Sequence, residues 1–174
     1  NEIEISNNIF LRELGEIPSL FAFPYGETNE EIINLLKEYK FKVAFGQHSG
    51  VINETSNFYY LPRFSLNEKY GAIDRVKFAA NAKGLGIYDF IPKDPTIYDN
   101  PPFIGFSLLD EKLVPSIDCF VFDSKGEVAK EIFKFNERIE IRLNRKLTEG
   151  RSRMNCTAKG SDGLWRWFGH QFYL

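Results

Sequence analysis

Three kinds of side chain in this sequence could take part in chemistry or ligand binding. His48 lies in a polar loop after an apolar run, where an imidazole can exchange a proton near neutral pH, or be a surface histidine without a function. Arg63 follows a Leu-Pro step and could orient a carboxylate or a sugar hydroxyl, or form an ordinary salt bridge. Trp165 and Trp167 alternate along a predicted strand, so they could stack on sugar rings or close a small β core.

The best-defined of the elements that must position these residues is a strand, a tight turn and a helix. Residues 20–23 form an apolar run, Pro24 then removes a backbone donor, and Gly26 can take a positive φ. Thr28 and Glu31 have the spacing of a capping box, which predicts a helix directly after the turn. The turn therefore lies at the carboxyl end of a strand, where α/β proteins build their sites, although an ordinary βα turn has the same pattern.

Three stretches of the first half have a recognisable order and spacing. They read Phe-Ala-Phe-Pro-Tyr-Gly-Glu at 21–27, Ala-Phe-Gly-Gln-His-Ser-Gly at 44–50 and Leu-Pro-Arg-Phe at 61–64. Together they resemble the polysaccharide deacetylases, the NodB-homology family of carbohydrate esterases, over roughly the first hundred residues. The family's Asp-Asp pair and its His-x-x-x-His motif have no match, and Ala22 stands where many members have arginine. The resemblance implies that the chain begins partway through a deacetylase domain.

The resemblance also implies roles for individual residues. The backbone N–H of Tyr25 would face an oxyanion, and His48 would give a proton to a leaving amine. Pro24, Gly26 and Arg63 would shape the site and bind substrate. The full-length enzyme would need a divalent metal ion, with zinc the expected one, to hydrolyse N-acetyl groups of a cell-surface glycan. No metal ligand is assigned in this chain, so we expect it to bind no metal and to be inactive alone.

Composition describes a packed globular protein. Hydrophobic residues make up 43% of the chain, with 17 Phe and 8 Tyr, and 22 basic residues stand against 24 acidic ones. No basic run is long enough for a track of phosphate contacts, which argues against a nucleic-acid partner. No apolar stretch has the length of a transmembrane helix, so we expect no membrane span.

Two cysteines, Cys119 and Cys156, lie on predicted strands of the second half. Such a pair can be two buried thiols in a cytosolic protein or one disulfide in an exported protein. Neither has a histidine or cysteine at metal-ligand spacing. The resemblance to a cell-envelope enzyme favours the disulfide, and with it a cell-envelope or secreted location.

The patterns predict an α/β chain with a partial (β/α) deacetylase barrel over 1–99 and a small antiparallel β-sandwich over 100–174. The first part should contain helices at 6–14, 29–39 and 71–83 and strands at 20–23, 41–45, 58–61 and 87–91. Prolines between 92 and 102 are typical of a linker. The second part should contain short strands at 103–108, 117–122, 128–135, 138–143, 154–158 and 164–168.

The leading interpretation is a fragment of a polysaccharide deacetylase, whose partners are a glycan substrate and a missing amino-terminal segment or partner chain. We expect an exposed sheet edge, or an edge covered by another chain. Tyr25 and His48 should open on the same side of the sheet, because their strands should be parallel and close together. The alternatives are a non-catalytic carbohydrate-binding protein that uses Trp165 and Trp167, and a structural cell-envelope protein.

Overall fold

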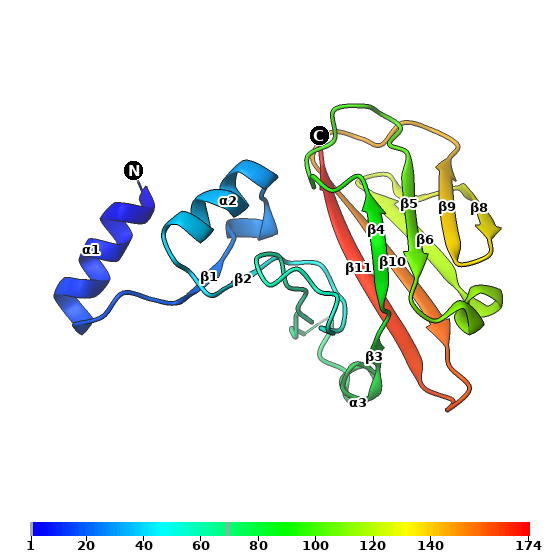
Figure 1. Cartoon of the computed structure of the whole chain (residues 1–174), viewed down its shortest axis with the longest axis horizontal. Coiled ribbons are helices and arrows are strands. Elements are labelled where there is room, and N and C mark those ends of the chain that lie inside the picture. Colours follow the sequence, from blue (N-terminus) through cyan, green and yellow to red (C-terminus); the bar gives the residue numbers. More distant parts are fainter. Residues whose placement is uncertain (1, 69) are drawn as a thin grey trace.

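The computed structural model describes residues 2–68 and 70–174, which form a small parallel region and an antiparallel β-sandwich (Figure 1). The parallel region, positions 2–82, contains α1 (Glu2–Leu14), β1 (Leu20–Ala22), the 3-10 turn η1 (Pro24–Gly26), α2 (Glu30–Glu38), β2 (Val43–Phe45) and α3 (Ile73–Asn81). No described helix has both the length and the apolar character needed to cross a bilayer.

The two strands of the parallel region are neighbours, with Phe21 opposite Ala44 in a parallel register. This confirms the predicted β-α-β unit, in which α2 makes the crossover. The expected strand at 58–61 is reduced to a single bridge between Phe45 and Leu61. The side chain of Asn57 accepts a hydrogen bond from Tyr59 N at 2.9 Å, so this segment is a turn instead of a strand. The described residues therefore contain no barrel, and the expectation of a partial barrel is wrong.

The start of α2 differs from the predicted capping box. The helix begins at Glu30, and Asn29 is its N-cap, because the Asn29 side chain accepts a hydrogen bond from Ile32 N at 2.8 Å. The Thr28 hydroxyl instead donates to the Asn29 carbonyl. The register of the helix still buries its apolar face, with Leu36 completely covered.

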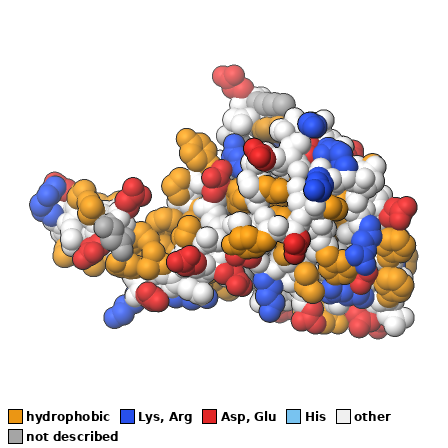
Figure 2. Space-filling view, turned by 90° about the horizontal axis from the view of Figure 1, so that it is seen from above, with side chains coloured by type: hydrophobic (Ala, Val, Ile, Leu, Met, Phe, Trp, Pro, Cys, Tyr) orange, Lys and Arg blue, Asp and Glu red, His pale blue; other side chains and the backbone are white. Residues whose placement is uncertain are grey.

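The first helix, α1, keeps most of its apolar side chains exposed. Figure 1 shows it standing apart from the rest of the chain, and Figure 2 shows apolar side chains gathered at that end of the molecule. Ile5 is 58% exposed, Leu14 is 67% exposed, and Leu20 on the neighbouring strand is 58% exposed. Among the described strands only β2 pairs with β1. The outer edge of β1 is therefore open, as expected.

The sandwich consists of two antiparallel layers, apart from one short parallel pair between β3 and β11. One sheet has the order β3-β11-β10-β6-β7 and the other the order β4-β5-β9-β8. Their bounds are β3 (Lys83–Gly84), β4 (Ile87–Ile91), β5 (Ile104–Leu108), β6 (Asp118–Asp123), β7 (Gly126–Val128), β8 (Lys130–Phe135), β9 (Arg138–Leu143), β10 (Arg151–Lys159) and β11 (Trp165–Tyr173), with a 3-10 helix η2 at Glu111–Ser116. Alternating residues such as Ile139 and Ile141 are fully buried between the layers, which confirms the predicted sandwich.

Strand β4 belongs to the sandwich and not to the parallel region. It pairs antiparallel with β5, where Ile87 lies opposite Leu108, because both side chains are buried in the sandwich core. The sandwich thus includes residues on both sides of position 99. The proline-rich segment 92–102 is also packed: Ile97 N donates to the Tyr173 carbonyl at 2.7 Å, and the Ile97 side chain is buried. It is a structured connection between neighbouring strands.

The predicted disulfide is confirmed. Cys119 on β6 and Cys156 on β10 are directly opposed in the antiparallel register and form a bridge across 37 positions of sequence. Both residues are completely buried. The bridge therefore links two neighbouring interior strands of one sheet inside the core.

Candidate functional site

The turn after β1 has the shape that its sequence predicts. Gly26 has a φ of 76° and donates through its N–H to the Phe23 carbonyl at 2.9 Å. A Cβ at Gly26 would lie 2.5 Å from Gln47 N, so glycine is needed for its backbone angle and for its close contact. Tyr25 also has a positive φ, 57°, which is unusual for a residue with a side chain. The residue is 69% exposed, so the strain is not explained by burial of the side chain.

The last strand of the sandwich holds this turn in place. The Gln171 side chain donates to the Tyr25 carbonyl at 3.3 Å, and the Tyr173 hydroxyl donates to the Gly26 carbonyl. The Tyr60 hydroxyl lies 3.5 Å from the same Gly26 oxygen. Gln171 and Tyr173 are two apart on β11, so they face the same side. These contacts join residues 146 and 147 positions apart in the sequence, which is why sequence reasoning missed them.

A third residue of the sandwich, Arg151 on β10, bridges the ends of β1 and β2. Its guanidinium lies 5.7 Å from the centre of the Tyr25 ring and donates to the Gln47 side chain at 3.3 Å. It is also 3.8 Å from the Glu27 carboxylate. The sandwich therefore contacts both loops that follow the parallel strands.

The loop after β2 is held by Arg63. The Arg63 side chain donates through Nε to the Gly46 carbonyl at 2.8 Å, and its backbone N–H donates to the His48 carbonyl at 2.9 Å. These bonds define the path of the loop at 46–48. A role for Arg63 toward a substrate stays a prediction, which would have to use its remaining guanidinium donors.

His48 points inward from this loop. Its ring is 4.5 Å from the Tyr60 ring and only 4% of the residue is exposed. Burial lowers the pKa of His48 to about 3, because desolvation disfavours the imidazolium. The side chain is therefore neutral at neutral pH, and its Nδ1 has no hydrogen-bond partner among the described residues. Its predicted role as a proton donor requires that it first take up a proton.

The second histidine, His170, comes from β11 and lies near the first. The two imidazole rings are 6.2 Å apart between centroids. His170 packs against Phe90 at 4.6 Å and Phe172 at 4.8 Å. Burial, with a smaller contribution from His48, lowers the pKa of His170 well below its usual value. Within 2–68 and 70–174, its Nε2 also has no hydrogen-bond partner. The sequence contained no local signal that would bring these two histidines together.

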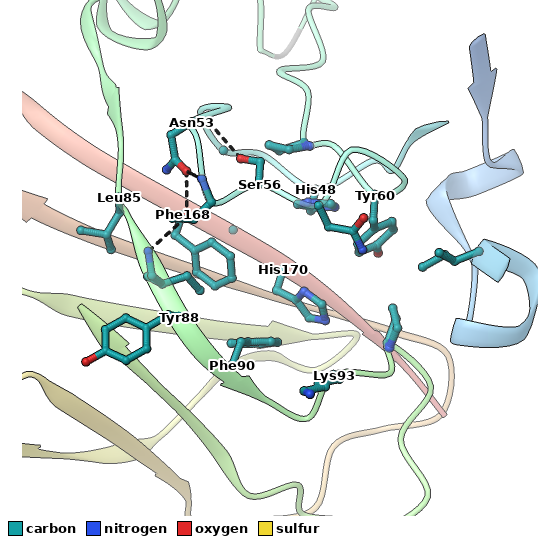
Figure 3. Close-up of a pocket in the computed structure, with 18 of the residues that line it drawn as sticks. His48, Asn53, Ser56, Tyr60, Leu85, Tyr88, Phe90, Lys93, Phe168 and His170 are labelled. Carbon is teal, nitrogen blue, oxygen red and sulfur yellow. Dashed lines mark hydrogen bonds between the residues drawn. The ribbon is translucent and has the colours of Figure 1, made fainter. Parts of the chain in front are cut away.

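Both histidines line a cavity of about 470 Å³ between the loop at 48–57 and the edge of the sandwich. We call it the seam cavity. Figure 3 shows His48 and Tyr60 on one side of it, with His170, Phe168 and Phe90 on the sandwich side. Tyr25 does not line this cavity, although its turn touches the same loop through Gly26 and Gln47. The structure thus brings the two predicted loops together, and only His48 of the predicted catalytic pair reaches the cavity.

The predicted aromatic pair lies elsewhere on β11. Trp165 is 38% exposed, whereas the indole of Trp167 donates to the Asn155 side chain at 3.0 Å and contacts Phe64. Phe78 of α3 lies against both indoles, with ring centroids 6.3 Å from Trp165 and 5.8 Å from Trp167. Helix α3 therefore covers much of the face that a sugar would need for stacking.

The implied zinc ion does not fit the residues of this chain. Across 2–68 and 70–174, no group of three or more His, Cys, Asp or Glu side chains is placed to hold a metal ion. A zinc site needs three or four such ligands. Any ligands for the metal would have to come from outside the described residues.

No model of a protein family matches the sequence, and no curated protein matches it. Among solved structures, the copper resistance protein PcoC of Escherichia coli is 15% identical, with a TM-score of 0.41, over 50% of this chain and 96% of that chain. CopC from Methylosinus trichosporium OB3b is 15% identical, with a TM-score of 0.40, over 51% and 90%. The Lin-41 filamin domain is 20% identical, with a TM-score of 0.35, over 49% and 84%. These likenesses assign neither a family nor an activity to the chain.

Proposed function

We propose that this chain is part of a polysaccharide deacetylase, which hydrolyses N-acetyl groups of a cell-surface glycan. The observation that carries the proposal is the contact between two strand-end loops. The turn at Tyr25 and the loop at His48 follow parallel neighbouring strands and meet where Gly26 packs on Gln47. Loops at the carboxyl ends of parallel strands are where α/β enzymes place their reacting groups.

In the proposed reaction each loop has one task. The Tyr25 N–H stabilises the oxyanion that forms when water attacks the acetyl carbonyl. The attacking water gives its proton to a base that comes with the metal-binding segment, and His48, once protonated, would give its proton to the leaving amine, so that acetate and a free amine are released. The metal ion expected in the full-length enzyme would polarise the carbonyl.

The exposed surfaces of the parallel region support a partner for this chain. The open edge of β1 and the uncovered apolar side of α1, including Ile5 and Leu14, lie next to each other in sequence. Large exposed apolar patches mark interaction sites in proteins. We propose that an amino-terminal segment or a separate chain covers it and brings the metal ligands.

A cell-envelope or secreted location belongs to the same proposal. The buried Cys119–Cys156 disulfide fits an oxidising compartment, where such bonds form and persist. A non-catalytic carbohydrate-binding protein is the second candidate, and the seam cavity is the observation that favours it. A purely structural cell-envelope role is the third and has no specific feature in its favour.

The test is a turnover measurement on the complete enzyme, meaning this chain together with the segment or partner that supplies the metal ligands. His48→Phe keeps the ring contact with Tyr60 and removes proton transfer. We expect acetate release from oligomers of N-acetylglucosamine to fall by roughly a hundredfold or more. Bound metal should stay constant, because His48 is not a ligand. Lys125→Ala, in an exposed turn of the sandwich, is the control. Unchanged turnover in His48→Phe would exclude the assigned role.

A further inference from the structure

The seam cavity exists because the sandwich is incomplete along one side. Strand β11 pairs with β3 only at Arg166 and Trp167, so none of the described strands lies beside the next part of its outer edge. The loop that follows β2 lies over this edge, and Gly169 makes the approach possible, because a Cβ there would overlap the Ser49 carbonyl oxygen. The cavity lies between this loop, α2 and the sandwich (Figure 3).

The wall of the cavity on the sandwich side is largely apolar and aromatic. Phe90, Phe168 and Tyr88 present rings from β4 and β11, beside the buried side chains of Leu85 and Ile87. Aromatic rings of this kind bind the apolar faces of ligands that also carry polar groups. The opposite wall is the polar loop, whose own side chains are largely engaged: Ser56 Oγ accepts from the Asn53 N–H, and Asn53 Oδ1 from the Thr55 N–H.

No described residue makes a hydrogen bond to the side chain of His48 or of His170. Nδ1 of His48 and Nε2 of His170 have almost no accessible surface, which leaves Nε2 of His48 and Nδ1 of His170 as the ring nitrogens that can face the cavity. Both histidines are more than nine-tenths buried and line the cavity. A neutral imidazole has one donor and one acceptor nitrogen, and burial keeps both rings neutral. Hydroxyl groups both donate and accept, so they match such a pair whichever tautomer each ring adopts.

The charges around the cavity leave no net attraction for an ion. Glu30 and Asp89 are acidic, Lys37 and Lys93 are basic, and all four are exposed to solvent at its lining. No charged side chain among the described lining residues is buried. A ligand that enters fully would therefore lose solvation of its charge without compensation, which favours an uncharged ligand.

We propose that the seam cavity binds one uncharged sugar unit. The sugar's apolar face packs on Phe90 and Phe168, and its hydroxyls bond to the nitrogens of His48 and His170. A volume of about 470 Å³ accommodates a single ring with substituents and lies within the usual range for ligand sites. The choice of a glycan as the source of the sugar rests on the proposed function. The sandwich then supplies half of a sugar site instead of being an appended domain.

The test is equilibrium binding of free sugars to this chain, followed by saturation-transfer NMR and calorimetry at pH 7. We expect N-acetylglucosamine or glucose to bind, and cationic glucosamine and anionic glucose 6-phosphate to bind at least tenfold more weakly. His170→Leu should raise the Kd at least tenfold. Tyr88→Ala should raise it about threefold; this residue is 39% exposed, so that variant should fold even if His170→Leu does not.

Three results would overturn the proposal. The first is that no uncharged sugar binds, and the second is that the charged sugars bind equally well. The third is that Trp165→Ala loses binding while the separate variants His170→Leu and Tyr88→Ala bind normally. The last result would move the site to the indole pair. Binding in the cavity without any deacetylation by the complete enzyme would leave the sugar site standing and remove the proposed function. Deacetylation together with no sugar binding would do the reverse.

Discussion

The sandwich and the parallel region bury their apolar residues in different ways. The sandwich closes its core between its own two sheets, where Phe106, Ile139 and Ile141 are completely covered. The parallel region has a two-stranded sheet and a small cluster around Phe23 and Leu36, while α1 exposes its apolar side. A two-stranded sheet is too small to be stable by itself. The comparison shows that the candidate site lies where the parallel region, which depends on contacts from outside, packs against the sandwich, which has a core of its own.

Separating the two regions should give the largest effect. We expect residues 83–174 alone to fold with the disulfide formed and to unfold cooperatively, because the core of the sandwich lies within them. Residues 1–82 alone should show no cooperative transition, since they lose the contacts from Gln171 and Tyr173. Circular dichroism during urea unfolding measures both. A cooperative transition in 1–82 would contradict the comparison.

Removing the disulfide should have the second-largest effect, a lower stability of the sandwich. Cys119→Ala with Cys156→Ala should lower the free energy of unfolding by roughly 3–4 kcal/mol in the loop-entropy model for a 37-residue separation. The urea midpoint of the whole chain should fall, and it should fall in residues 83–174 alone as well. Alkylation of both thiols in the native, unreduced protein would show instead that the bridge is absent.

Lowering the pH should destabilise the protein through the two histidines of the seam cavity. Both pKa values are lower in the folded state than the usual 6.5. Below pH 6.5 the unfolded chain therefore binds more protons than the folded chain, and the free energy of unfolding decreases as the pH is lowered. Between pH 6.5 and 5 we expect the free energy of unfolding to decrease by about 3 kcal/mol for the two residues together.

The matched control for that experiment is the double variant His48→Phe with His170→Phe, measured by urea unfolding over the same pH range. Its stability should change much less between pH 6.5 and 5, because the remaining acid dependence comes from carboxylates that titrate mainly at lower pH. Equal slopes for the two proteins would show that the histidines are not buried as the structure places them.

A single methyl group should sharpen the comparison further. Gly169→Ala places a Cβ against the Ser49 backbone carbonyl, which cannot move without displacing the loop over the seam cavity. We expect the free energy of unfolding to fall by about 2 kcal/mol, which is typical of overpacking. Gly86→Ala is the control, because its Cβ would meet only the flexible Leu109 side chain. Amide NMR shifts should change in the loop at 46–51 for the first variant and stay at their native values there for the second.

Local chemistry decided much of this protein before any tertiary contact was known. Short strand-like runs predicted the strands of the sandwich, with period-two alternation over 138–143, and the step from Pro24 to Gly26 predicted a turn with a positive φ. The cysteine pairing was also predicted, because both residues lie on predicted strands of one small sandwich and the resemblance favoured an oxidised pair. Such features depend on residues close in the chain or on one strand pattern, so the sequence contains them directly.

Tertiary structure alone decided the site. Strand β4 follows the parallel region in the sequence, but it pairs within the sandwich because this position buries Ile87 in the sandwich core. The turn at Tyr25 is held by Gln171, and His48 meets His170, each across more than a hundred residues. No local pattern specifies which edge of a sandwich a distant loop will cover. That choice depends on shape, on Gly169 in particular, and on the free energy of burying both surfaces together.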